Sequence, residues 1–154
     1  MSTRAIKYLE KAGIPFAVIK YEHDEKGAAF AARATGYPLE RTVKTLIADL
    51  GGKQYVLVLM PGDRQLSLKR LADVFRVKRA GMADVMTAER LTGYLVGGIS
   101  PFGTRQTLPV VMEEQVLRFD EILINAGQRG TMLKMDPKDI QAALTCRVAA
   151  VAEE

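Results

Sequence analysis

Residues that commonly do chemistry are scarce in this sequence, which has one cysteine and one histidine among 154 residues. A single cysteine, Cys146, excludes an internal disulfide and fits a reducing cytoplasm. No cysteine pair or histidine cluster has the spacing of metal ligands, so we expect no metal and no other cofactor. A Ser/His or Cys/His pair would need His23 or Cys146. We predict instead that His23 is an exposed loop residue and that Cys146 is a small apolar filler near the last strand.

Other absences narrow the function further. The chain has neither a GxxxxGK[ST] phosphate loop nor a GxGxxG turn after a strand. No apolar run approaches the roughly 18 residues of a membrane helix, and the N-terminus lacks the apolar region of a signal peptide. We therefore expect a cytoplasmic protein without a membrane partner. It has no tryptophan, which argues against a stacking platform for single strands, while its net charge of +4 mildly favours an anionic partner such as tRNA.

Apolar periodicity, caps and breakers predict short helices mixed with hairpins. Helices are expected at residues 3–12, 28–34, 68–75, 88–93 and 137–144, with a helical turn at 37–40. Strands are expected at residues 16–21, 43–50, 53–60, 77–79, 108–112, 121–125, 131–135 and 147–152. The strand at 16–21 is expected to be mostly buried, Thr87 to cap its helix, and residues 126–130 to form a loop.

This order of elements lacks the steady alternation of strand and helix found in doubly wound sheets. It predicts an α+β fold, with a mixed sheet or partly closed barrel and helices packed outside it. The length suggests a single domain spanning residues 1–154. The clearest hairpin joins the strands at 43–50 and 53–60 through Gly51-Gly52.

Lys44 is a charged residue inside the apolar run VKTLI. Alternation along a strand places Val43 and Thr45 on one face and Lys44 and Leu46 on the other, so the lysine can point outward from a strand edge. Leu46 would then share its face with a charge, and a lysine among apolar neighbours either meets an anion or becomes a displaced base. The pattern by itself favours the outward-facing lysine over a functional one.

The segment YLVGGISPFGTRQ, residues 94–106, is rich in glycine and proline. Gly97, Gly98 and Gly103 can adopt φ > 0, while Pro101 fixes its own φ and restricts Ser100. Two interpretations remain: a shaped loop whose backbone N–H groups approach a ligand closely, and a tight surface turn. Local composition alone favours the turn.

Three segments in this order resemble the YbaK/EbsC-type family of aminoacyl-tRNA deacylases, free-standing relatives of the editing domain in bacterial prolyl-tRNA synthetase. They are VKTLI at residues 43–47, TGYLVGGISPFG at 92–103 and INAGQRG at 124–130. The IPF and YEHD segments near the N-terminus agree as well. The resemblance spans most of the chain, and GGISPFG is its most specific part.

The resemblance implies a strongly curved mixed sheet flanked by helices, the YbaK/prolyl-tRNA synthetase editing-domain fold. It implies hydrolysis in trans of the ester that joins a wrong amino acid to the 3′ end of tRNA. The expected substrates are Cys-tRNA-Pro or Cys-tRNA-Cys, with other small amino acids as alternatives. The implied partner is the acceptor end of a mischarged tRNA, and prolyl- or cysteinyl-tRNA synthetase is a further candidate. The oligomeric state, monomer or weak dimer, stays open.

The resemblance also implies the site. The expected catalytic residues are Lys44, Gly97, Gly98 and Ser100. The expected substrate-binding residues are Tyr21, Thr45, Ile99, Pro101, Phe102, Gly103, Asn125, Gly127 and Met132.

Two positions depart from the family pattern. Cysteinyl-tRNA deacylases of this family usually have a serine where Asn125 stands, and some members have an acidic residue where Met132 stands. Because both lie near the aminoacyl pocket in the family, the departures bear on amino-acid specificity more than on the reaction type. They also keep open an alternative function, a catalytically silent module that binds tRNA ends, a synthetase or an aminoacyl nucleotide.

An aminoacyl ester is already activated, so the expected mechanism needs no protein nucleophile. Backbone N–H groups of residues 97–100 would stabilise the oxyanion, and Lys44 would hold the ribose or phosphate end of the terminal adenosine. Ser100 has no evident base partner, so we expect a ligand contact or a loop cap. Asn125 either hydrogen-bonds the substrate or ties the second loop to the first. Two interpretations of the densest basic stretch are equally favoured: a surface that binds tRNA, and a solvent-exposed helix face with its following loop. The stretch consists of Lys69, Arg70, Arg76, Lys78 and Arg79.

Overall fold

The computed structural model describes residues 2–22 and 28–154. Its helices are α1 (Arg4–Ala12), α2 (Ala28–Thr35), α3 (Leu68–Phe75), α4 (Val85–Thr92) and α5 (Pro137–Leu144), with 3-10 turns η1 (Leu39–Arg41) and η2 (Glu114–Arg118). Its strands are β1 (Ala17–Lys20), β2 (Thr42–Asp49), β3 (Tyr55–Pro61), β4 (Gly81–Met82), β5 (Val110–Glu113), β6 (Ile122–Gln128), β7 (Thr131–Met135) and β8 (Arg147–Ala149). Within these residues, no helix is long and apolar enough to span a bilayer.

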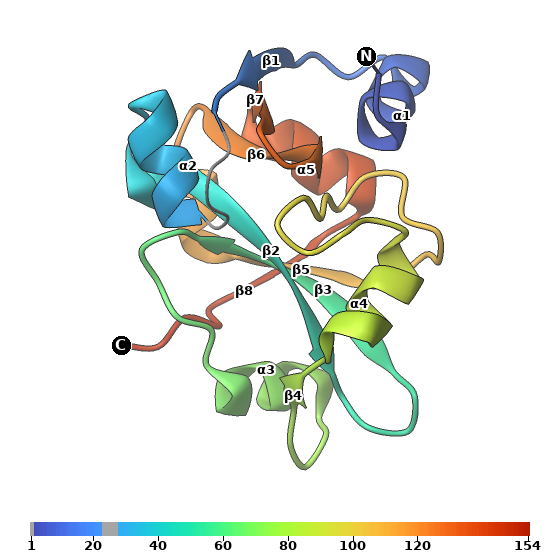
Figure 1. Ribbon diagram of the computed structural model, residues 1–154. Coiled ribbons are helices and arrows are strands. Elements are labelled where there is room, and N and C mark those ends of the chain that lie inside the picture. The colour runs from blue at the N-terminus through green and yellow to red at the C-terminus, as the bar shows by residue number, and fades with distance from the viewer. Residues whose placement is uncertain (1, 23–27) are drawn as a thin grey trace.

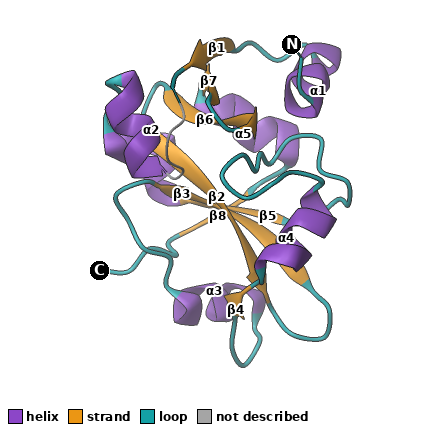
Figure 2. Ribbon diagram, in the orientation of Figure 1, coloured by secondary structure: helices purple, strands orange, loops and turns teal. Residues whose placement is uncertain are grey.

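The strands of the described residues form one mixed sheet in the order β1-β7-β6-β2-β3-β5-β8, and β4 pairs with β2 beside this path. The ladders β1–β7, β7–β6, β2–β3 and β2–β4 are antiparallel, whereas β6–β2, β3–β5 and β5–β8 are parallel. The strands twist strongly across the molecule, and the helices lie around them (Figure 1, Figure 2). The predicted α+β class, with a curved mixed sheet and external helices, is confirmed.

The β2–β3 hairpin is buried on both faces, which explains its nearly continuous apolar sequence. Leu57 and Leu59 pack into the larger core cluster, together with residues of α1, α4 and α5. Val58 and Met60 point to the opposite face and pack with Leu71 of α3. The period of two along β3 therefore divides its side chains between two cores.

Helix ends follow the local sequence closely. The side chains of Thr3, Ser67 and Asp136 accept backbone N–H groups at the starts of α1, α3 and α5, as the capping pattern predicts. The cap of α4 was predicted wrongly. Asp84 accepts the N–H of Thr87, so the helix begins at Val85 rather than after Thr87. Aspartate and threonine both favour the cap position, and the upstream residue takes it here.

Three strand predictions need correction. Strand β1 is mostly exposed rather than buried, because it lies at the sheet edge and pairs with β7 alone. The brief strand expected at residues 77–79 forms instead at Gly81–Met82. Residues 126–128 are not a loop, because β6 continues to Gln128 through an irregularity in its ladder with β7.

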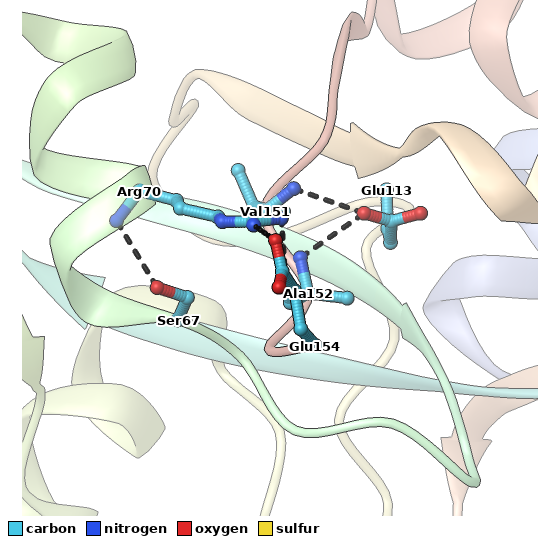
Figure 3. A network of polar contacts seen from close by, with 6 residues as sticks. All are labelled: Ser67, Arg70, Glu113, Val151, Ala152 and Glu154. Atoms are coloured by element: carbon cyan, nitrogen blue, oxygen red, sulfur yellow. Dashed lines mark hydrogen bonds and ion pairs between the residues drawn. The ribbon is translucent and has the colours of Figure 1, made fainter.

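The C-terminal segment is attached to the fold by a buried carboxylate (Figure 3). Glu113, at the end of β5, is 1% exposed, and its Oε1 accepts the N–H groups of Val151 and Ala152 at 2.9 and 3.1 Å. Its Oε2 accepts the N–H of Gln115 at 2.7 Å. Arg70 of α3 donates to the carbonyl of Ala152, so α3, β5 and the C-terminal segment meet at one point.

Candidate active site

A cavity of about 250 Å³ lies between the sheet, α2 and the loop that follows α4. The ladder between β2 and β6 contains only the pairs Thr42–Leu123 and Val43–Ile124. The cavity lies where this pairing ends, so residues from both faces of β2 line it. Its lining is Tyr21, Ala28, Ala31, Val43, Lys44, Thr45, Leu46, Val96, Gly97, Ile99, Asn125 and Met132.

Lys44 is half-buried in this largely apolar surface. Burial lowers the pKa of its ammonium group, and the negative charge of Asp63 acts in the opposite direction. Among the described residues, the ammonium has no hydrogen bond or ion pair. Lys44 therefore offers a partly desolvated cation with three donors to a ligand in the cavity.

Thr45 brings a second polar group to the cavity. Its Oγ1 is buried and makes no hydrogen bond with any described residue. An unpaired buried hydroxyl is costly, typically about 1–3 kcal/mol, so proteins usually satisfy such groups. The buried position of this oxygen means that a ligand in the cavity would reach it only after the surrounding atoms moved.

The first half of the glycine loop, residues 95–98, is a tight turn held from outside. Gly98 donates its N–H to the carbonyl of Leu95 at 2.9 Å, and Gly97 has a φ of 96°. Glu89 of α4 accepts the N–H of Val96 at 2.9 Å. A Cβ on Gly98 would lie 2.9 Å from the backbone nitrogen of Arg129, so only glycine permits this approach to the β6–β7 turn.

Two side chains from the β6–β7 region hold the carbonyl groups of the same turn. Arg129 donates from Nη2 to the Val96 carbonyl at 3.2 Å, and Asn125 donates from Nδ2 to the Gly97 carbonyl at 3.2 Å. Asn125 Oδ1 in turn accepts the N–H groups of Gly127 and Gln128. Asn125 therefore ties the second loop to the first, which is one of the two roles expected for it.

The hydrogen bonds of this turn decide which amide groups are available. The Gly98 N–H is bonded to Leu95 within the loop, and the Val96 N–H is bonded to Glu89 of α4. Gly97 and Ile99 both line the cavity, and their N–H groups make no hydrogen bond with a described residue. These two amides are therefore the candidate donors of this turn for a ligand oxygen.

The second half of the loop turns away from this cavity. Ser100 is completely buried, and its Oγ accepts the N–H of Phe102, so it acts as a loop cap. Phe102 is itself fully buried in the larger core, and its carbonyl accepts the hydroxyl of Tyr94. Pro101 and Gly103 line a different hollow beside Tyr8. Ser100 has no serine-protease-like role in this geometry, because no base contacts its hydroxyl among the described residues.

Of the remaining predicted residues, Met132 and Tyr21 line the cavity and Gly127 does not. Met132 is 3% exposed and packs with Ala31 of α2. The ring of Tyr21 lies 6.3 Å from that of Phe30, centroid to centroid. Gly127 lies outside the cavity lining, against Tyr94, where a Cβ would come within 2.6 Å of the tyrosine ring.

The structure thus brings seven of the predicted residues together and separates six from them. Those lining the cavity are Tyr21, Lys44, Thr45, Gly97, Ile99, Asn125 and Met132. Those outside its lining are Gly98, Ser100, Pro101, Phe102, Gly103 and Gly127. His23 lies outside the described residues. Cys146 packs against the larger core, where burial raises the pKa of its thiol to about 12.

Several contributing residues escaped the sequence analysis. Glu89 and Arg129 hold the turn, and Asp63 acts on Lys44. The apolar lining from α2, Ala28 and Ala31, was also missed as part of the site. No local signal identifies these residues, since Arg129 and Asp63 act on partners distant in the sequence and Glu89 bonds across the end of its helix to Val96. Within the described residues, no group of three or more His, Cys, Asp or Glu side chains could hold a metal ion.

Comparison with known proteins gives consistent matches over most of the chain. The profile of the family described as "Aminoacyl-tRNA editing domain" matches residues 22–143. The chain is 29% identical over 140 residues to EbsC of Enterococcus faecalis, to which Cys-tRNA(Pro)/Cys-tRNA(Cys) deacylase activity is ascribed; the match covers 90% of this chain and 85% of EbsC. It is 33% identical over 128 residues to the multifunctional Ser/Thr-tRNA deacylase ProXp-y of Escherichia coli, covering 80% and 76%.

Similarity extends to a solved structure. A crystal structure to which a trans-editing role for prolyl tRNA synthetase is ascribed superposes with a TM-score of 0.90 and 26% identity, covering 100% of this chain and 99% of that one. This agreement supports the predicted editing-domain fold.

Proposed function

The chain belongs to the aminoacyl-tRNA editing domain family, and we propose that it is an aminoacyl-tRNA deacylase that hydrolyses the ester of a mischarged tRNA in trans. One observation carries this proposal for the present chain. Among the described residues, a half-buried lysine without a hydrogen bond or ion pair shares one cavity with two backbone N–H groups that also lack a hydrogen bond, those of Gly97 and Ile99. A cation beside an amide pair suits a ligand with a phosphate or ribose end and a carbonyl oxygen.

Hydrolysis needs only water as the second reactant. The water oxygen forms a bond to the ester carbonyl carbon, and the carbonyl electron pair moves onto its oxygen. The tetrahedral intermediate then expels the ribose oxygen, which takes up one of the two protons of the water, and the amino acid leaves as a carboxylate because the other proton passes to solvent. The negative oxygen is the species that needs stabilising.

The N–H groups of Gly97 and Ile99 are the proposed donors to that oxygen. A well-aimed donor of this kind typically contributes roughly 3 kcal/mol to the stability of the transition state. Lys44 would hold the terminal adenosine through its ribose or phosphate, and fixing the ester in this way can supply on the order of 7 kcal/mol in favourable cases. No protein nucleophile is required.

Asn125 and Met132 are proposed to set the amino-acid preference, since both line the cavity. Cys-tRNA-Pro and Cys-tRNA-Cys are the first substrates to test, because EbsC carries these activities in its name. Serine and threonine esters come next, because ProXp-y is named for them. A prolyl- or cysteinyl-tRNA synthetase is the proposed protein partner.

A deacylation panel tests this function. The purified chain meets tRNA-Pro charged with Cys, Ala, Ser or Thr, and tRNA-Cys charged with Cys. Lys44→Ala is assayed beside a matched control, Lys138→Ala, which removes an exposed lysine of α5. We expect rapid loss of one ester, abolished by Lys44→Ala and retained by the control. If Lys44→Ala left every deacylation intact, the role assigned to Lys44 would be wrong.

A second candidate function has a specific observation in its favour. Among the described residues that line the cavity there is no carboxylate and no imidazole, so no obvious general base is present. A catalytically silent module that binds tRNA ends, a synthetase or an aminoacyl nucleotide would have such a site. Binding of uncharged tRNA with no hydrolysis of any ester in the panel would favour this module over the deacylase.

A further inference from the structure

The side chain of Arg129 makes one hydrogen bond with the described residues, and its acceptor belongs to the peptide bond next to the proposed oxyanion site. Its Nη2 donates to the carbonyl of Val96 at 3.2 Å. That carbonyl and the N–H of Gly97 belong to one peptide unit. In a trans peptide the C=O and N–H bonds point in opposite directions, so a donor that holds the carbonyl also sets the direction of the N–H.

We propose that Arg129 is a positioning residue for the deacylation reaction: by holding the Val96 carbonyl, it keeps the Gly97 N–H directed at the ester oxygen in the cavity. This inference rests on the proposed function and adds a residue to it. A hydrogen bond at the carbonyl end also polarises the peptide unit, which strengthens the N–H as a donor.

The rest of the turn supports this role. Glu89 holds the preceding amide by accepting the Val96 N–H, and Asn125 holds the following unit through the Gly97 carbonyl. The N–H of that following unit, on Gly98, is occupied by Leu95. Side chains thus hold the carbonyls of two consecutive peptide units, Val96–Gly97 and Gly97–Gly98. Only the first unit, which Arg129 holds, has an N–H without a hydrogen bond to a described residue.

The location of Arg129 fits an indirect role. It is exposed, at the β6–β7 turn, and is not among the residues that line the cavity. The Cα of Gly98 packs against the backbone of this same turn, so Arg129 and the glycine loop are held in register. An exposed arginine near a tRNA site could also contact phosphate, and the kinetics separate the two roles.

The test compares Arg129→Met and Arg129→Lys with the wild type and with Arg118→Met, an exposed arginine of η2. The substrate is the ester that the wild type hydrolyses fastest. We expect Arg129→Met to lower kcat about tenfold with KM changed less than about twofold, as for loss of a transition-state interaction. Arg129→Lys keeps a donor and should recover part of the loss, and Arg118→Met should match the wild type. An unchanged kcat in Arg129→Met would overturn the proposal. A raised KM that also depends less on salt concentration would overturn it too, and would indicate that Arg129 contacts a tRNA phosphate.

A second readout does not depend on activity. In 15N-labelled protein, Arg129→Met should shift the Gly97 amide resonance, whereas Arg118→Met should not. If the wild type hydrolyses no ester but this shift occurs, the proposed function fails while the link between Arg129 and the Gly97 amide stands. An unmoved Gly97 resonance removes the link itself.

Discussion

At the scale of single residues, two polar groups at the cavity have no hydrogen-bond partner among the residues that the structure describes. Lys44 has no described partner for its ammonium, and Thr45 has none for its hydroxyl. Folding gains nothing from either group in this state, since burial disfavours a charge and an unpaired hydroxyl alike. For Lys44, which lines the cavity and is only partly buried, an anionic ligand would supply the missing hydrogen bonds.

Asp63→Asn should alter the pH dependence of deacylation. Burial lowers the pKa of Lys44 and the charge of Asp63 raises it. Removing that charge leaves the effect of burial unopposed, so the pKa falls further and Lys44 loses its proton at lower pH. The alkaline limb of the profile of kcat/KM against pH should therefore move to lower pH.

The control for this prediction is Asp120→Asn, another exposed aspartate that does not act on Lys44. Its profile should coincide with that of the wild type. An alkaline limb that stays in place in Asp63→Asn would mean that activity does not depend on the charge of Lys44.

At the scale of the elements, two contacts between distant segments matter most. One joins the glycine loop to the β6–β7 turn, and the other joins the C-terminal segment to β5. Each relies on a residue type that no close analogue replaces: a glycine in the first and a carboxylate with two accepting oxygens in the second. They should respond differently to substitution, because the first shapes the site and the second supports the fold.

Gly98→Ala should lower the deacylation rate strongly while changing the thermal stability of the fold little. The added Cβ would lie 2.9 Å from the backbone nitrogen of Arg129, and backbone cannot move aside as a flexible side chain can. The loop must therefore shift away from the turn, which displaces the amide donors, and a shift of about 1 Å can cost about 100-fold in rate. Steady-state kinetics and thermal unfolding measure the two effects. The control is Gly81→Ala, where a Cβ meets nothing within 4 Å.

Glu113→Gln should destabilise the fold. Oε1 accepts two N–H groups and Oε2 accepts a third, whereas an amide keeps one accepting oxygen and places an NH₂ group against an N–H donor. Leaving one buried donor unsatisfied costs about 1–3 kcal/mol. Urea unfolding should show this loss, with kcat/KM of the folded protein nearly unchanged. Glu114→Gln, at an exposed neighbour, is the control. Equal midpoints for the two variants would contradict the prediction.

At the scale of the whole molecule, the open question is where a tRNA would lie. The basic stretch divides in the structure. Arg70 is engaged with the C-terminal segment, whereas Lys78 and Arg79 line a separate hollow that includes Asp49. A tRNA-binding surface along this stretch therefore stays a prediction, and Lys78 and Arg79 are the residues with which to test it. The prediction of a single domain over residues 1–154 also stays a prediction.

Lys78→Glu combined with Arg79→Glu should weaken tRNA binding if this tRNA-binding surface exists. Each lost phosphate contact reduces the slope of log K against log salt by about 0.7–0.9. Binding measured from 50 to 200 mM salt would report the change, and hydrolysis of a short aminoacyl-RNA end should be unaffected. An unchanged slope would remove these residues from the binding surface.

The sequence by itself predicted the fold class, most of the helix starts and the segments that meet at the cavity. Capping residues such as Thr3, Ser67 and Asp136 mark helix starts because they bond to amides two or three positions away. The hairpin of β2 and β3 was predicted from the apolar runs on either side of Gly51-Gly52, but its turn is longer than those two residues, because Leu50 bonds to Gln54 and Lys53 also has a positive φ. The motifs around Lys44, Gly97 and Asn125 were recognisable as a pattern, and the structure brings these three residues to one cavity.

Only the tertiary structure decided how the parts of the site act on one another. It left the Gly97 amide without a hydrogen bond to any described residue while the Gly98 amide bonds to Leu95, and it turned Ser100 and Phe102 away from the cavity. It also brought Arg129 to the Val96 carbonyl. The physical reason is the distance along the sequence between the residues that interact. Caps and turns depend on neighbours along the chain, whereas the choice among adjacent amides depends on side chains that reach the loop only when the sheet sets the register of β6 against β7 and α4 packs in the core.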